Sequence, residues 1–136
     1  MTSATAHVPA DLAALGAVRS HLAAALAGER WSPDASSRVL IASTEAMANA
    51  VEHGSAPGAG VDVSFAVTDE TAWVRVLAAG CPGCDAPLDA PTAPPVTSTG
   101  GRGRLLMRAL ADQMRVSRRG LGTEVQLGFG RDAAPC

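Results

Sequence analysis

The spacing of apolar residues predicts two helices in the first part of the chain. Within Ala10–Ala27, large apolar side chains recur at steps of three and four residues, as the buried side of a helix requires. These positions are Leu12, Leu15, Val18, Leu22 and Leu26. Gly28 fits the end of this helix. Ser32, followed by a proline, is typical of an N-cap and first turn, so we expect a second helix from there to about His53, ended by Gly54.

Alternation of apolar and polar residues predicts strands in the remainder of the chain. Val61–Val67 and Thr71–Leu77 alternate in this way, and the three residues that join them are polar, which indicates a β-hairpin. The same reasoning predicts a short opening strand and a closing pair of strands, at Thr5–Pro9, Met114–Arg118 and Thr123–Phe129.

A glycine cluster, Gly100–Gly103, precedes a third expected helix from Arg104 to about Asp112. The proline-rich stretch Gly80–Thr99 has no period and is expected to be a long loop, of the kind that forms lids or binding loops. The resulting element order predicts an α+β two-layer sandwich, with a mixed but mainly antiparallel sheet and about three helices on one face. A length of 136 residues is enough for a single domain, 1–136.

Composition and charge exclude several classes of protein. With 47% hydrophobic and 18% charged residues, the chain is too apolar for intrinsic disorder, and a net charge of −2 argues against direct nucleic-acid binding or membrane attraction. No long apolar stretch or signal peptide is present, so a cytoplasmic protein is expected. All 11 basic residues are arginine, and the absence of lysine excludes both a Walker A loop and a conventional protein kinase.

The second expected helix carries the strongest candidate chemistry. Glu45 and Asn49 lie one turn apart, with Glu52 on the same side. A carboxylate can deprotonate a nucleophile, a contribution of about 10²–10⁴ in rate, and an amide oxygen is a suitable ligand for Mg²⁺. The alternative is a polar face that simply contacts water. The core stripe of this helix is predicted at Leu40, Thr44, Met47 and Val51.

Two further segments are candidates for ligand contacts. Gly100–Arg104 combines glycines, which allow close backbone approach, with a helix start and two arginines, which together suit a phosphate. The alternative is a flexible hinge before a helix. Thr123, at the start of the last strand, places a small hydroxyl where it can reach a ligand, or it is an ordinary β-branched strand residue.

In this order and spacing, the segments resemble the anti-sigma-factor serine/threonine kinases of the GHKL superfamily, the Bergerat-fold or histidine kinase-like ATPases. The resemblance covers nearly the whole chain and is most distinctive from Gly100 to Asp112. The matching segments are Glu45 to Asn49 with His53, Gly80 to Gly83, Gly100 to Asp112, and Gly122 with Thr123.

The resemblance implies an enzyme that uses ATP and Mg²⁺. Glu45 is implied as the general base and Asn49 as the residue that holds Mg²⁺ on the phosphates, with Thr123 near the adenine. The other implied nucleotide contacts are His53, Gly80, Gly83, Gly100, Gly101, Arg102, Gly103 and Arg104. Similar proteins bind a sigma factor, phosphorylate a serine on a small STAS-domain antagonist, and form homodimers through the sheet side.

One departure from the family pattern keeps a second function open. Ala78 stands where the family has an aspartate that receives the adenine amino group. A hydrogen bond to a charged partner contributes roughly 1.5–3 kcal/mol, so nucleotide binding should be about ten- to a hundredfold weaker. The alternative is therefore a non-catalytic module of the same fold that regulates partners by occupancy.

A third possibility is a redox site at Cys81 and Cys84. It lacks the helix that should follow such a pair and lower the thiolate pKa, because prolines come next in the sequence.

Overall fold

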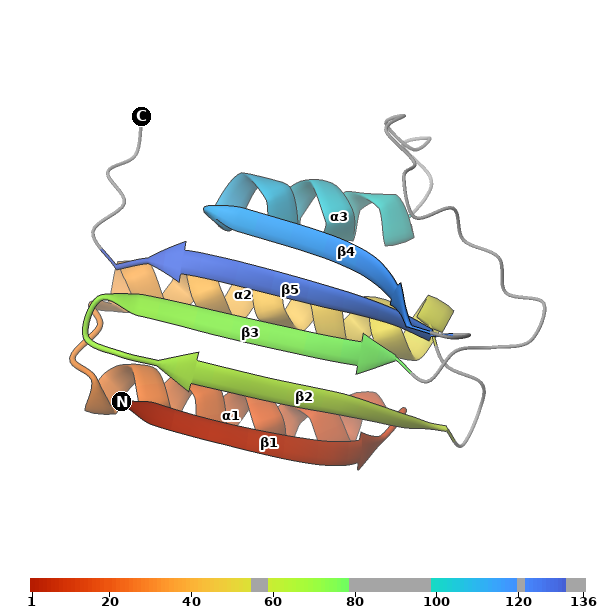
Figure 1. Cartoon of the computed structure of the whole chain (residues 1–136), viewed down its shortest axis with the longest axis horizontal. Helices are drawn as coiled ribbons and strands as arrows, with labels where there is room; N and C mark the ends of the chain where they lie inside the picture. Colours follow the sequence, from red (N-terminus) through yellow and green to blue (C-terminus); the bar gives the residue numbers. More distant parts are fainter. Residues whose placement is uncertain (55–58, 79–98, 120–121, 132–136) are drawn as a thin grey trace.

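The computed structural model describes residues 1–54, 59–78, 99–119 and 122–131, which form two layers (Figure 1). Five strands make one sheet, and three α-helices lie on one of its faces. In chain order the elements are β1 (Thr2–Pro9), α1 (Leu12–Gly28), α2 (Pro33–Asn49), the π-helical turn η1 (Ala50–Gly54), β2 (Gly60–Val67), β3 (Thr71–Ala78), α3 (Thr99–Leu110), β4 (Gln113–Arg119) and β5 (Gly122–Gly130). The predicted α+β sandwich is confirmed.

The sheet has the strand order β1-β2-β3-β5-β4, and every neighbouring pair is antiparallel. The predicted hairpin is present as β2 and β3, and the predicted closing pair is present as β4 and β5. The opening strand begins at Thr2, earlier than the predicted Thr5, because β1 pairs with the whole length of β2. No helix in the described part of the chain is long and apolar enough to cross a membrane.

The core fills the space between the helices and one face of the sheet. Alternate side chains of β2 and β3 point into it, as the period of two requires, and α1 contributes the leucines and valine of its predicted apolar side, apart from the exposed Leu12. The fully buried side chains at its centre include Leu22, Leu26, Val39, Val61, Val67, Val74 and Leu127.

The buried side of α2 differs from the predicted stripe. Of the predicted positions only Met47 is buried, whereas Leu40, Thr44 and Val51 are half-buried. Half of the buried residues of α2 are alanine, and these small side chains let the helix lie close to the strands. The buried positions are Ala35, Val39, Ala42, Ser43, Ala46 and Met47.

Capping side chains fix the starts of α1 and α2, and the cap of α2 is the predicted one. Ser32 is the N-cap of α2, where its hydroxyl accepts a hydrogen bond from the Ala35 N–H (3.2 Å). Asp11 caps α1 in the same way, through the Ala13 N–H (2.8 Å). At its other end α1 includes Gly28, and the left-handed residue that follows the helix is Arg30 (φ 64°).

Candidate functional site

The side of α2 that carries Glu45 and Asn49 faces α3. Arg38 lies on the same side. Glu45 and Asn49 follow it by seven and eleven residues, which places each of them within about 20° of Arg38 around the helix axis. The Arg38 guanidinium donates a hydrogen bond to the carbonyl oxygen of Leu110, the last residue of α3 (3.4 Å). α2 and α3 pack against each other. Glu45 and Asn49, which are both half-buried, therefore border the space between the two helices.

The two helices run in opposite directions, as Figure 1 shows. Arg38, in the first half of α2, meets the end of α3, so later residues of α2 lie beside earlier residues of α3. At a rise of about 1.5 Å per residue, Glu45 is roughly level with Gly103 and Asn49 with Thr99. The residues that carry the carboxylate and the amide thus lie level with the glycine-rich start of α3.

The same end of the molecule holds the end of β3 and the start of β5 (Figure 1). Ala78 and Thr123 pair directly across these two strands. Thr123 is half-buried and lies on the helix-covered face, since it alternates in step with the buried Leu127. η1, which continues α2 beyond Asn49, packs against both strands. π-helical turns are frequent at functional sites, and this one joins the helix to the strand ends.

The predicted start of the third helix, Arg104, is wrong, since α3 runs from Thr99 to Leu110. Glycine disfavours a helix interior by about 1 kcal/mol, but packing against α2 outweighs that preference here. The backbone N–H groups without an intrahelical partner are those of the first turn, Thr99–Arg102. A helix N-terminus of this kind favours an anion such as a phosphate.

Gly100 and Gly103 lie on the same side of α3 as the buried Met107, by helical spacing. Since glycine has no side chain, the backbone of α3 is uncovered at these two positions. A ligand between α3 and α2 can therefore approach the α3 backbone closely.

The polar groups at this end include oxygen donors of the kind that Mg²⁺ binds. The described residues contain no group of three or more His, Cys, Asp or Glu side chains that could hold a metal ion. Mg²⁺ commonly takes one or two protein oxygens together with phosphates and water. The Asn49 amide, one turn from the Glu45 carboxylate, is a donor set of that type.

The structure describes the side chains of Glu45, Asn49 and Thr123 and brings them to one end of the fold. For two further groups only the backbone is described: His53 belongs to η1, and Gly100, Gly101, Arg102, Gly103 and Arg104 belong to α3. Outside the described residues lie Gly80, Cys81, Gly83 and Cys84, together with most of the predicted loop.

A sequence model of the histidine kinase-like ATPase domain matches residues 8–129. The chain belongs to this family. The resemblance read from the motifs is thereby confirmed at the level of the superfamily. The family match includes every candidate residue on α2, α3 and β5.

The fold is shared with a solved structure of the RsbU and RsbW domains of Rv1364c from Mycobacterium tuberculosis. The TM-score is 0.71 at 21% sequence identity, and the match covers 96% of this chain and 33% of that chain. This chain thus spans about a third of the length of that neighbour. No curated protein matches the sequence.

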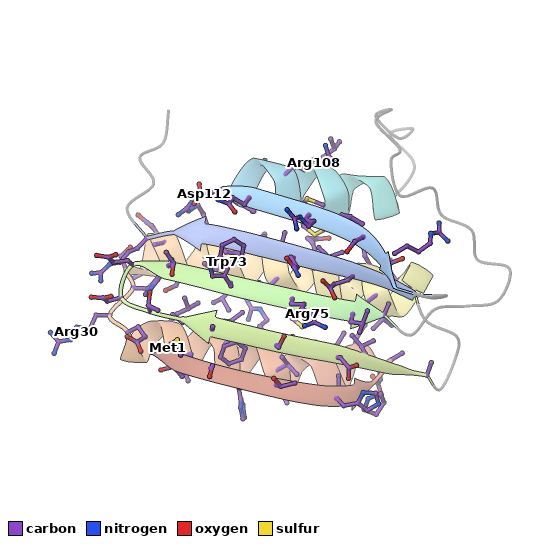
Figure 2. The ribbon with its side chains drawn as sticks, viewed as in Figure 1. Met1, Arg30, Trp73, Arg75, Arg108 and Asp112 are labelled. Atoms are coloured by element: carbon purple, nitrogen blue, oxygen red, sulfur yellow. The ribbon has the colours of Figure 1, made fainter. Side chains whose placement is uncertain are left out.

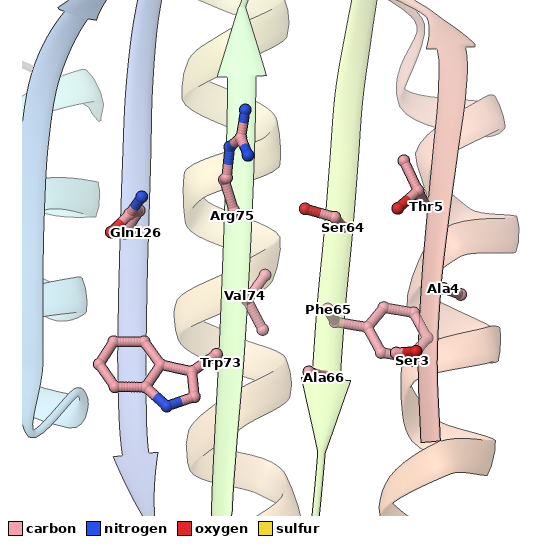
Figure 3. Close-up of a pocket in the computed structure, with 10 residues that line it drawn as sticks. All are labelled: Ser3, Ala4, Thr5, Ser64, Phe65, Ala66, Trp73, Val74, Arg75 and Gln126. Carbon is pink, nitrogen blue, oxygen red and sulfur yellow. The ribbon is translucent and has the colours of Figure 1, made fainter. Parts of the chain in front are cut away.

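The sequence does not predict the role of Arg38 or the hollow on the outer face of the sheet. Arg38 could have been found from its helical spacing to Glu45 and Asn49. On the outer face, a shallow hollow of about 600 Å³ crosses β1, β2, β3 and β5, with Trp73 and Arg75 on its floor (Figure 3). The Trp73 ring lies over Gly128, where an added Cβ would come within 2.7 Å of the indole. The hollow itself has no sequence pattern that predicts it.

Proposed function

We propose that this chain binds Mg-ATP and transfers the terminal phosphoryl group to a serine of a STAS-domain antagonist, and thereby controls a sigma factor. The observation that carries the proposal is the position of Glu45 and Asn49, which border the space between α2 and the glycine-rich start of α3. Membership of the histidine kinase-like ATPase family supports the use of ATP. The shared fold with a chain that contains an RsbW domain supports a role in sigma-factor control.

In this proposal each part of the site has a separate task. The first-turn N–H groups of α3, with Arg102 and Arg104, hold the phosphates. The Glu45 carboxylate takes the proton of the serine hydroxyl. At the same time the serine oxygen bonds to the γ-phosphorus, and the bond between the γ-phosphorus and the oxygen that leaves with ADP breaks. The Asn49 amide oxygen holds Mg²⁺, which supplies charge neutralisation on the phosphates. Thr123 contacts the adenine end.

A second candidate function rests on Ala78. Its methyl group is buried (2% exposed) at the end of β3, directly opposite Thr123, and offers no acceptor for an adenine amino group. This favours a non-catalytic module of the same fold, which regulates its partners by binding alone. The two functions differ in whether Glu45 is needed.

A homodimer through the outer sheet face is part of the proposal. Trp73 is 44% exposed there, and no described helix covers that face. Arg75, beside it, forms an ion pair with Glu124 on the neighbouring strand (Nε–Oε2 3.0 Å). An exposed indole held flat against a sheet is a common anchor in protein interfaces.

The test is phosphoryl transfer from labelled ATP to purified STAS-domain proteins. We expect transfer by the unmodified chain and a loss of about 10²-fold or more in Glu45→Gln. Glu70→Gln removes the same charge in the β2–β3 turn, at the other end of the sheet, and should act like the unmodified chain. Equal partner binding by the unmodified chain and Glu45→Gln, without any transfer, would favour the non-catalytic function.

A further inference from the structure

The Arg38 side chain joins three elements at the end of the molecule away from the proposed nucleotide site. Its Nη2 donates to the carbonyl oxygen of Gly130, the last residue of β5 (2.8 Å). Its Nη1 donates to the carbonyl oxygen of Leu110 at the end of α3 (3.4 Å) and lies 3.7 Å from Asp112 Oδ1. The Arg38 side chain is only 26% exposed, so these contacts are partly shielded from water.

Asp112 completes this junction (Figure 2). Its carboxylate accepts a hydrogen bond from the Gly130 N–H (2.5 Å), and its own N–H donates to the Gly128 carbonyl (2.9 Å). The end of α3 is therefore tied both to β5 and, through Arg38, to α2. A cation on the last carbonyl of a helix also complements the helix dipole.

The opposite end of α3 has no such support from its own sequence. Three of its first five residues are glycine, each of which disfavours the helix by about 1 kcal/mol relative to alanine. Beyond the Arg38 junction, and among the α3 side chains that the structure describes (residues 105–110), Met107 is the buried one. The Arg38 junction and Met107 both lie in the C-terminal half of α3 and fix the direction of the helix from there.

Because α3 is long, a small tilt at its C-terminal end displaces its N-terminal end by several times more than residues near the tilt. α3 has 12 residues and is about 18 Å long, so a tilt of about 10° at Leu110 moves Thr99 by roughly 3 Å. A shift of that size takes the first-turn N–H groups out of hydrogen-bond distance, about 2.7–3.2 Å, of a phosphate held between the two helices. The glycine-rich first turn must keep its place relative to Glu45 and Asn49 if these groups are to share one ligand.

We propose that Arg38 is a positioning residue that sets the orientation of α3 and, with it, the affinity for the nucleotide phosphates. The inference rests on the proposed function. Arg38 acts through α3 and touches no ligand, because it lies about 10 Å from Glu45 along α2. Replacement of Arg38 should therefore weaken ATP binding while the transfer step at Glu45 remains intact.

The first experiment compares Arg38→Leu and Arg38→Lys with Arg108→Leu. Arg108, on the exposed side of the same helix, controls for the loss of one positive charge near an anionic ligand (Figure 2). We expect Arg38→Leu to raise the Kd and the KM for Mg-ATP roughly tenfold with kcat changed less than about twofold. Arg38→Lys should recover part of the affinity, and Arg108→Leu should match the unmodified chain.

The second experiment measures amide hydrogen exchange without nucleotide. In Arg38→Leu, the amides of α3 should exchange faster while those of the β2–β3 hairpin keep their protection. Unchanged α3 exchange, unchanged ATP affinity, or a loss of protection throughout the fold would each overturn the positioning role. If the unmodified chain binds no Mg-ATP, the proposed function fails, and the exchange comparison still shows whether Arg38 orients α3.

Discussion

At the scale of single residues, two positions depart from what their local structure favours. Arg30 has a φ of 64° after α1, a conformation that costs most non-glycine residues about 1 kcal/mol or more. It is retained because the backbone there closes the helix, with the Arg30 N–H bonded to Ala27 and the Trp31 N–H to Leu26 (both 3.0 Å). Trp31 is thereby placed so that its indole N–H reaches the Thr68 carbonyl (2.8 Å).

Arg30→Gly should stabilise the protein by about 0.5–1 kcal/mol, because glycine adopts this φ without strain. Urea unfolding measures the change. Arg30→Ala removes the same exposed side chain but keeps the strain, so its stability should stay near that of the unmodified chain. Equal gains in the two variants would mean that the left-handed backbone is not the cause.

Ser43 is the second such position. Its side chain is fully buried (0% exposed) in α2, and within the described residues its hydroxyl has no hydrogen-bond partner. Ser43→Ala should therefore raise the free energy of unfolding by about 1 kcal/mol. Ser37→Ala, at an exposed position of the same helix, measures the effect of helix propensity alone. An increase in the free energy of unfolding no larger than that of Ser37→Ala would show that the Ser43 hydroxyl has a hydrogen-bond partner.

At the scale of elements, the sequence predicted what repeats and missed what depends on packing. The hairpin of β2 and β3 was clear because one face is buried and the other is not. The core side of α2 was misplaced because alanines, which the apolar pattern does not weigh, pack against the sheet. The sequence predicts too late a start for α3 because glycine has a low helix propensity. Packing against α2, which the sequence does not show, outweighs that propensity.

Glu29 joins the end of α1 to the start of β1. Its carboxylate lies 3.2 Å from the Met1 ammonium and accepts a hydrogen bond from the Thr2 hydroxyl (3.1 Å). The ammonium, followed by the Thr2 hydroxyl, lowers the pKa of Glu29 below its ordinary value of 4.5. A depressed pKa in the folded state means stabilisation that is present at neutral pH and is lost as the pH falls through that pKa.

Glu29→Gln should therefore lower the urea midpoint at pH 7, and the difference from the unmodified chain should disappear in acid. Glu70→Gln in the β2–β3 turn serves as control, since among the described residues its carboxylate forms no ion pair, and it should show no difference at either pH. A Glu29→Gln deficit of equal size at neutral and acid pH would exclude the ion pair as its origin.

At the scale of the whole molecule, the candidate site could be predicted as a set of residues but not as an arrangement. Glu45 and Asn49 were recognisable because a helix repeats every turn, and the sequence alone pairs them. Their position beside α3 depends on the antiparallel packing of two helices separated by a long stretch of chain, and on Arg38, whose hydrogen bonds go to backbone carbonyls. Every residue has a backbone carbonyl, so the sequence does not reveal which carbonyls Arg38 bonds.

The outer sheet face should mediate a homodimer. Trp73→Glu places a charge at the centre of that face and should convert a dimer to a monomer, as measured by light scattering. Ile41→Glu is the matched control, since Ile41 is an apolar residue of similar exposure (42% against 44%) on α2, whereas Trp73 is on the sheet. A monomeric unmodified chain, or equal dissociation by both variants, would contradict a dimer through Trp73.

The most direct test of the account is calorimetric titration of ATP, with and without Mg²⁺, into the unmodified chain and Asn49→Ala. If Asn49 and the start of α3 share one nucleotide, the unmodified chain binds ATP more tightly with Mg²⁺ present, and Asn49→Ala loses most of that magnesium dependence while it remains folded. No binding at millimolar Mg-ATP, or the same magnesium dependence in both proteins, would contradict the account.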